Sequence, residues 1–510
     1  MTAAENHTTI LSIAPSPLDH NVLWVGTDDG NVQVTRDGGR TWTNVVRNIR
    51  GVPAATWVPH VEASKFDVAE AFVVFDDHRR ANWTPYVYRT TDHGRSWTSL
   101  ATPDLWGFVH VLEQDPVNRD LLYLGTEFGL YVSFNGGRAW MRWPEGFPTV
   151  PVRALIVHPR DHDLVIGTHG RSAWILDDVR PLRAITAATL AEPLHLFQIG
   201  PAIQHRQASA PGYSSTGDAL YSGENRDYGA ILTYAVSPGS DTGRVQIAIQ
   251  DSAGTVIRNF DGPARRGVNR TTWNLRRDGL RLPPGTGGFG GGGFGGGAQG
   301  PEVLPGTYTV RITLGDQRSE QPVVVQPDPR YPATMLAVRA QTLALIDSAG
   351  HLLEIAGEAT TRLRQAQRAV RSTTEALRGS SDTASQAVAR AAGTLRDTLQ
   401  SALDSLTEPT DRQGLFRGGD DVMGQLRSVV FGLGFQWDAP TAAQRQRMAK
   451  AEAKFDRTLA QYNRAMAQLA EFRRRADQVG ASPFPVTEPL TREWQPPEAP
   501  RRPGRRRPGG

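Results

Sequence analysis

The chain has 510 residues, no cysteine and a formal net charge of +4. The absence of cysteine excludes disulfides, thiolate zinc sites and a cysteine nucleophile. Hydrophobic residues make up 39% of the chain and charged residues 21%, a balance typical of globular domains with polar linkers, and this length predicts about three domains. No apolar run is long enough for a transmembrane helix, and the first residues lack a signal-peptide pattern.

One motif occurs three times, at 35–42, 90–97 and 133–140. It starts with Ser or Thr, followed by Asp or Asn two positions later, Gly two positions after that and Trp three further on. The acidic or amide positions lie 55 and 43 residues apart, a spacing typical of one four-stranded propeller blade per repeat. The motif residues expected to be structural are Asp37, Gly39, Trp42, Asp92, Gly94, Trp97, Asn135, Gly137 and Trp140.

Each motif residue has a structural role in a tight hairpin. Asp or Asn accepts backbone N–H bonds within its own turn, and Gly supplies a positive φ. The Trp packs a large apolar face over the turn. A catalytic role for Asp37 and Asp92 is the weaker interpretation, because a turn explains both residues without any reaction.

The residues before each motif also repeat. A short apolar strand and a turn precede an apolar run ending in Gly-Thr at 26–27, 125–126 and 167–168. The fourth copy has lost its motif at 173–178, so we expect it to be the last blade. The segment 1–182 is therefore predicted to form four β-propeller blades.

These motifs are similar to the Asp-box, or BNR, repeats of sialidases, other glycoside hydrolases and sortilin-like receptors. The longer strings 25–45, 85–100, 122–140 and 164–178 resemble the last blades of large bacterial proteins called BNR-repeat glycosyl hydrolases or sortilin N-terminal domain proteins. The resemblance extends from about residue 5 to 481. It implies a FlgD-like immunoglobulin module and a helical segment after the propeller, and further blades before this segment, so that the chain is expected to be a C-terminal portion.

The pattern of apolar residues changes twice in the rest of the chain. The segment 183–226 is predicted to be a linker, and 227–328 a FlgD/Ig-like β-sandwich of about seven short strands. Its glycine-rich stretch at 285–300 is expected to be a flexible loop, because no strand–turn–helix context supports a dinucleotide site. Apolar residues at helical spacing predict a helical hairpin or bundle over 333–480, with a dimerising coiled coil as the lesser alternative. The Pro/Arg-rich tail at 481–510 is expected to be disordered. The fold class is thus mainly β with an α-helical C-terminal part.

Propeller topology indicates where a ligand would bind. If the motifs join strands three and four of each blade, the loops between strands two and three lie on the opposite rim. These loops are strongly polar in all four copies. The ligand-rim candidates are Asp28, Asp29, Asp76, Asp77, His78, Arg79, Glu127, His169 and Arg171. They predict either a charged ligand mouth or solvated loops with local ion pairs.

Two functions remain open at this point. The first is a non-catalytic, extracytoplasmic, sortilin-like binding or scaffold protein, with a protein, peptide or glycan ligand on the rim and possible missing blades or a partner chain. The second is a sialidase- or xyloglucanase-like glycoside hydrolase that uses rim carboxylates. The sequence contains no arginine triad of a sialidase and no metal-ligand spacing. No cofactor, metal or specific nucleic acid is expected, and the catalytic residues are unknown.

Overall fold

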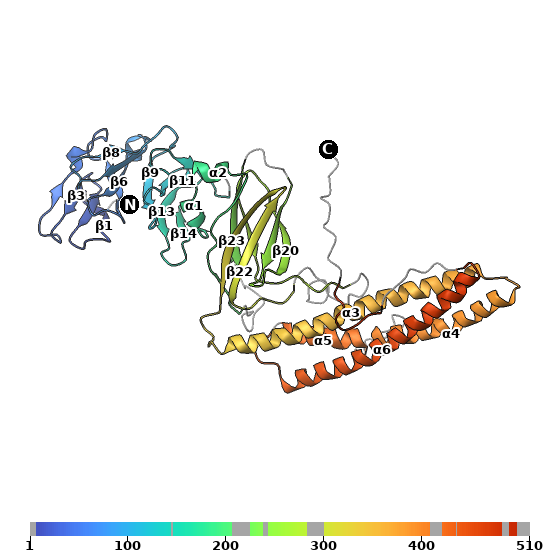
Figure 1. The fold of residues 1–510 in the computed structure, drawn as a ribbon. Helices are drawn as coiled ribbons and strands as arrows, with labels where there is room; N and C mark the ends of the chain where they lie inside the picture. Colours follow the sequence, from blue (N-terminus) through green and yellow to red (C-terminus); the bar gives the residue numbers. More distant parts are fainter. Residues whose placement is uncertain are drawn as a thin grey trace.

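The computed structural model describes residues 7–143, 146–206, 225–237, 243–282, 300–407, 421–434, 436–481 and 489–496. Short antiparallel sheets fill the amino-terminal part and long helices the carboxy-terminal part (Figure 1). The predicted mainly-β class with a helical C-terminal part is confirmed in these terms. Most of the glycine-rich stretch and most of the C-terminal tail lie outside the described residues.

Four small sheets follow one another along the chain, each built as an antiparallel meander in chain order. Sheet 1 contains β1 (Ile10–Pro15), β2 (Leu23–Thr27), β3 (Val32–Thr35) and β4 (Thr43–Asn44). Sheet 2 contains β5 (Trp57–Ala63), β6 (Ala71–Asp76), β7 (Tyr86–Thr90) and β8 (Thr98–Ser99). Sheet 3 contains β9 (Val109–Gln114), β10 (Leu122–Thr126), β11 (Gly129–Ser133) and β12 (Met141–Arg142). Sheet 4 has three strands in the described chain, β13 (Val152–Val157), β14 (Leu164–Thr168) and β15 (Ala173–Leu176).

The hydrophobic cores of this region lie between successive sheets. Trp24 and Val34 of sheet 1 pack with Val61 and Tyr88 of sheet 2 in one core. A second core joins sheets 2 and 3, and a third joins sheets 3 and 4. The first strands of neighbouring sheets are in contact, β1 with β5, β5 with β9 and β9 with β13. Stacking of four-stranded meanders around their first strands is propeller-like. The number of blades in a closed ring stays a prediction.

Two further sheets share a single core after the short helices α1 (Arg180–Arg183) and α2 (Ala187–Ala191). The smaller sheet contains β16 (Leu194–Leu196), β18 (Ala230–Val236) and β21 (Gly267–Trp273). The larger contains β17 (Ala202–Ile203), β23 (Gln317–Gln326), β22 (Gly306–Leu314), β19 (Val245–Gln250) and β20 (Val256–Gly262). Strands β16 and β17 fall inside the segment predicted to be a linker. They are too short to show alternation in the sequence, and their pairing with β18 and β23 places them in the sheets. The immunoglobulin-like identity of this two-sheet unit stays a prediction.

Four helices with one shared core follow the two-sheet unit in the described part of the chain. They are α3 (Met335–Ala376), α4 (Thr383–Leu406), α5 (Val422–Gly434) and α6 (Ala442–Gln478). Helix α6 begins with the capping box expected at Thr441 and Gln444, whose side chains each bond the other's backbone N–H. None of the described helices is long and apolar enough to cross a membrane.

Arg339 connects the helices to the two-sheet unit. Its guanidinium donates to Gln204 Oε1 at 2.6 Å and to Glu302 Oε2 at 3.2 Å. It also lies 4.2 Å from the ring centroid of Trp437. A buried guanidinium needs such partners to offset its lost hydration, so this contact fixes where α3 meets the sheets.

Candidate functional site

The motif turns join strands three and four of sheets 1, 2 and 3, and their acidic or amide side chains bond within the turn. Asp37 accepts from the backbone N of Thr41 at 2.9 Å, and its hydrogen bonds, chiefly from the Thr41 hydroxyl, lower its pKa to about 2. Asp92 accepts in the same way from Ser96. Asn135 accepts from the N of Ala139 at 2.9 Å. These turn contacts occupy the side chains and leave no need for a catalytic role.

The motif glycines and tryptophans meet the preceding sheet. Gly94 and Gly137 have φ of +82° and +86°, and a Cβ on either would lie 2.9 Å from a side chain of the sheet before it. Trp97 packs edge-on to Trp24 of sheet 1, with ring centroids 6.0 Å apart. Trp140 donates from Nε1 to the carbonyl of Leu100, the residue after β8 of sheet 2, at 2.9 Å. Gly39 and Trp42 of sheet 1 have the same local turn, but Trp42 is exposed.

Four of the rim carboxylates predicted from the sequence are bound by local groups. Asp28 is buried and accepts from the backbone N of residues 8 and 9. Asp29 bonds Thr27 and Asn31 on its own turn. Asp76 accepts from the N and Nδ1 of His78, at 3.0 and 2.6 Å. Asp77 accepts from Arg80 Nε at 2.5 Å and Asn82 Nδ2 at 2.8 Å.

The predicted basic rim residues are spread over different sheets. The guanidinium of Arg79 lies 3.5 Å from the ring centroid of Trp57, within sheet 2. His169 and Arg171 are exposed in the β14–β15 loop of sheet 4. There the backbone N of His169 donates to the carbonyl of Pro151, and the carbonyl of Arg171 accepts from Trp174 Nε1.

Glu127, in the β10–β11 loop, is the rim carboxylate with a partner from the next sheet. Its Oε2 lies 3.0 Å from His110 Nε2 and 3.7 Å from an Arg153 nitrogen. His110 is buried on β9, and desolvation, together with the charge of Arg153, lowers its pKa to about 3. His110 is therefore neutral at physiological pH.

An aromatic cluster that the sequence analysis did not single out lies beside these residues. Phe108 stacks on His78 with centroids 4.6 Å apart, and Trp106 stacks on Phe128 at 4.2 Å. Trp83 contacts both phenylalanines, at 5.3 and 6.5 Å. We call this set the aromatic rim, made of His78, Trp83, Trp106, Phe108 and Phe128.

The aromatic rim combines a packed base with two accessible indoles. Trp83 is 53% exposed and Trp106 58% exposed, whereas Phe108 is buried. His78 and Trp83 come from the β6–β7 loop of sheet 2, Phe128 from the β10–β11 loop and Trp106 from the segment before β9. The site therefore lies where sheets 2 and 3 meet, on the side opposite the motif turns. Only His78 of this set was among the predicted rim residues.

A second titratable cluster is formed by two carboxylates of the first strands β5 and β9 and by Lys65, which follows β5. Lys65 Nζ contacts Glu62 Oε1 at 2.6 Å and Glu113 Oε1 at 3.3 Å. Burial and the nearby carboxylate of Glu62 raise the pKa of Glu113 to about 7. Because both carboxylates share one ammonium and Glu113 also accepts from the backbone N of Val157 at 3.1 Å, we interpret this cluster as part of the contact between sheets.

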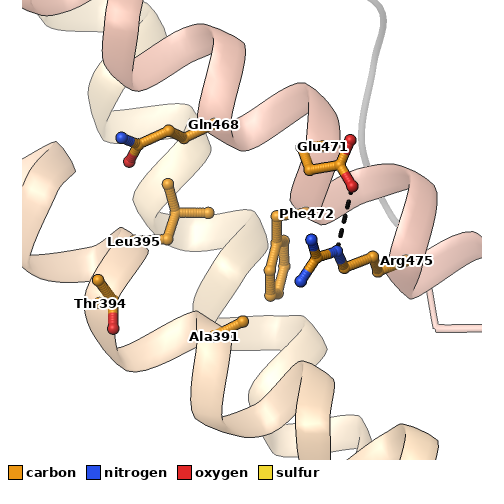
Figure 2. A pocket seen from close by; sticks show the side chains of 7 residues that line it. All are labelled: Ala391, Thr394, Leu395, Gln468, Glu471, Phe472 and Arg475. Atoms are coloured by element: carbon orange, nitrogen blue, oxygen red, sulfur yellow. Dashed lines mark hydrogen bonds and ion pairs between the residues drawn. The ribbon is translucent and has the colours of Figure 1, made fainter.

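The structure offers no metal centre in the residues it describes, since they contain no grouping of three or more His, Asp or Glu placed to hold an ion. A cavity of about 320 Å³ lies between α4 and α6 (Figure 2). Its lining includes Phe472 and the ion pair of Arg475 with Glu471, at 3.1 Å. This cavity lies on the helices, away from the predicted rim, and we assign no ligand to it.

Comparisons with known proteins do not assign the chain to a family. No family model matches it. An oligoxyloglucan-reducing end-specific xyloglucanase of Emericella nidulans is 31% identical over 96 residues, which cover 17% of this chain and 10% of the length of that enzyme. The match therefore spans about a tenth of this curated relative.

Solved structures with a similar arrangement of strands share little sequence. YCF48 bound to D1 peptide has 16% identity and a TM-score of 0.27, covering 61% of this chain and 82% of that one. The GH74 enzyme of Niastella koreensis has 18% identity and a TM-score of 0.27, covering 53% and 31%. Scores of this size fix neither a family nor a function, and both binding proteins and hydrolases occur among such neighbours.

Proposed function

We propose that this chain is part of an extracytoplasmic propeller protein that binds a glycan on the aromatic rim without cleaving it. The single observation that carries the proposal is the pair of half-exposed indoles, Trp83 and Trp106, held on a packed aromatic base. The two-sheet unit and the helices serve as a stalk or scaffold. The domain boundaries, the Asp-box family and the sortilin-like architecture predicted from the sequence belong to this proposal.

Exposed indoles fixed in position suit a glycan ligand. A sugar ring presents an apolar C–H face and a polar edge, and a rigid tryptophan buries the first at a small cost in side-chain entropy. The partly exposed carboxylate of Glu127, in the same loop as Phe128, can meet the hydroxyl groups. The short match to a xyloglucanase supports a β-glucan such as xyloglucan as the first ligand to examine.

Binding without hydrolysis is supported by the state of the rim carboxylates. A glycoside hydrolase needs two carboxyl groups flanking the scissile bond. Asp28, Asp76 and Asp77 are buried and hydrogen-bonded to neighbouring loop groups. They are occupied by structural contacts, which supports a binding role for the rim.

The alternative, a glycoside hydrolase, depends on Glu127. This carboxylate is partly exposed, borders the aromatic rim and has the neutral His110 beside it. A hydrolase of this kind would need a second carboxyl group. Among the rim carboxylates, Asp77 is the one that lies closest to Glu127 along the sequence, and we take it as the candidate.

One experiment separates the two functions. The chain is incubated with xyloglucan, and retention in affinity electrophoresis is measured together with the release of reducing ends. We expect retention without new reducing ends. Release of reducing ends that disappears in Glu127→Gln or Asp77→Asn would overturn the binding proposal in favour of the hydrolase, and the absence of both signals for xyloglucan and other β-glucans would overturn both.

A further inference from the structure

The first strands of sheets 1, 3 and 4 carry a β-bulge at the end next to the rim loops. The residue left out of the strand register is Leu11 in β1, His110 in β9 and Arg153 in β13. A bulge redirects the side chain of its extra residue, and bulges are frequent beside binding sites. Equivalent positions of three sheets therefore hold an aliphatic residue, an imidazole and a guanidinium.

The bulge residues of sheets 3 and 4 contact each other. Arg153 donates to His110 Nδ1 at 3.2 Å, and Nε2 of the same ring lies 3.0 Å from Glu127 Oε2. His110 is buried, so its packed ring holds the guanidinium in a fixed direction. The side chain of Arg153 is nevertheless 48% exposed. A positioned and accessible guanidinium thus lies at the junction of sheets 3 and 4.

Glu127 does not use the hydrogen-bonding capacity of Arg153. The Arg153 nitrogen nearest to the carboxylate lies 3.7 Å from Glu127 Oε2, which is beyond hydrogen-bond length. A guanidinium has five N–H groups, and among the residues that the structure describes only His110 accepts from Arg153. The planar fork of these groups matches the two oxygens of a carboxylate. Arg153 therefore suits an anionic group of a ligand.

Three consecutive residues, Glu127 to Gly129, connect this guanidinium to the aromatic rim. Glu127 lies beside Arg153, and Phe128 is a member of the aromatic rim. A second arginine lies near the third residue, because a Cβ on Gly129 would be 3.6 Å from Arg142 Nε. The aromatic rim and two guanidinium groups therefore border the same short stretch of chain.

We propose that the aromatic rim prefers an acidic glycan, and that Arg153 binds the carboxylate of a uronic acid residue in it. The inference rests on the proposed function, because it concerns the ligand of the same rim. Sugar rings stack on the indoles, and the carboxylate of a neighbouring ring accepts hydrogen bonds from the Arg153 guanidinium. Arg142 adds a second positive charge beside the same stretch of chain.

The charges around residues 127–129 favour an anion over a neutral group. Among the described side chains discussed above, two guanidinium groups accompany one carboxylate, that of Glu127, and His110 is neutral at physiological pH. An exposed guanidinium alone binds a carboxylate weakly, since water competes for both partners. The stacked aromatic rings beside it supply the apolar part of the binding energy. A carboxylate attached to a sugar ring combines the two kinds of contact.

The test compares two oligosaccharides that differ only in their carboxylates. Cellohexaose and the same hexasaccharide oxidised to carboxylates at C6 are titrated into the intact chain by calorimetry. We expect the oxidised probe to bind about tenfold more tightly at low salt. The preference should shrink when the NaCl concentration is raised from about 50 to about 500 mM, because salt screens exposed charges.

Two substitutions of Arg153 and one matched control assign the preference to its guanidinium. Arg153→Gln should largely remove the preference, and Arg153→Lys should keep part of it, because lysine retains the charge without the fork. The control is Arg160→Gln, at an exposed arginine of the same sheet 4 that pairs with Asp161 at 2.8 Å in the β13–β14 turn. It should keep the full preference. Both arginines are exposed, so Tm should change little in all three variants.

The outcomes separate this inference from the proposed function. Equal affinities for the two probes, or a preference that Arg153→Gln retains, would overturn the inference and leave glycan binding by the rim intact. Binding of neither hexasaccharide overturns the inference whether or not xyloglucan is retained in electrophoresis. A preference that is lost in Arg153→Gln, with an affinity that Trp83→Ala leaves unchanged, would support the carboxylate site and overturn the role of the indoles.

Discussion

His110 Nε2 donates a hydrogen bond to Glu127 Oε2 over 3.0 Å, while His110 Nδ1 accepts one from Arg153 over 3.2 Å. A guanidinium can only donate, so the neutral imidazole carries its hydrogen on Nε2. The contact ties β9 to the loop that holds Phe128 of the aromatic rim. It joins the charged and the aromatic parts of the candidate site.

The first prediction concerns pH. His110 has its folded-state pKa lowered from 6.5 to about 3 by burial, so it takes up a proton in the unfolded chain before the folded one. Its contribution to stability is therefore complete above pH 6.5 and is lost as the pH falls toward 3. In His110→Gln this part of the pH dependence should vanish, measured as Tm against pH. The exposed His20→Gln serves as control, and an equal change in both variants would contradict the prediction.

The second prediction concerns Glu113, whose folded-state pKa is raised from 4.5 to about 7. The folded chain keeps the proton longer than the unfolded chain, so stability falls as the pH rises from 4.5 through 7. Glu113→Gln should flatten this decline and raise the free energy of unfolding at pH 8 by roughly 1–2 kcal/mol. Urea denaturation at pH 5 and pH 8 measures it. A variant less stable than the parent at pH 8 would contradict the prediction, because it would show that the charge of Glu113 stabilises the folded chain.

The third prediction concerns a motif turn. Asp92→Ala removes the acceptor of the Ser96 N–H and hydroxyl bonds and should lower the free energy of unfolding by about 1–2 kcal/mol. Asp92→Asn keeps one acceptor oxygen and should lower the free energy of unfolding by less than Asp92→Ala. Glycan binding should be the same in both variants, as measured by calorimetry. A loss of binding with unchanged stability would instead assign a ligand role to the motif.

The fourth prediction concerns packing between sheets. Gly137 and Gly254 both have positive φ, of +86° and +81°, but only a Cβ on Gly137 meets a neighbour, Leu100 at 2.9 Å. Gly137→Ala should therefore destabilise the chain by about 1–3 kcal/mol more than Gly254→Ala. Thermal unfolding of the two variants gives the difference. Equal losses would mean that backbone strain alone accounts for the effect.

The sequence predicted the repeated sheets better than the site. The motif at Asp37 and its two copies marks each hairpin, because a turn of this geometry restricts its own residues locally. The aromatic rim had no such signal. Trp83 and Trp106 lie in unrepeated loops, and only the packing of sheet 3 on sheet 2 brings Phe128 between them.

For the rim carboxylates, the sequence predicted the residues but not their contacts. Polar residues after apolar strands indicated Asp28 and Asp77 as candidates, but the sequence does not show what they contact. Backbone N–H groups of residues 8 and 9 donate hydrogen bonds to Asp28. The side chains of Arg80 and Asn82 donate hydrogen bonds to Asp77. Strands β16 and β17 were missed for a related reason, since their partners lie far along the chain.

The central claim is that the exposed indoles of the aromatic rim bind a glycan, and titration calorimetry with xyloglucan oligosaccharide tests it most directly. Trp83→Ala and Trp106→Ala should each lose about 1–3 kcal/mol of binding free energy, with Tm nearly unchanged because both indoles are half exposed. Trp174→Ala, at an exposed tryptophan of sheet 4, should bind like the parent chain. Equal affinities in all four proteins would contradict the account.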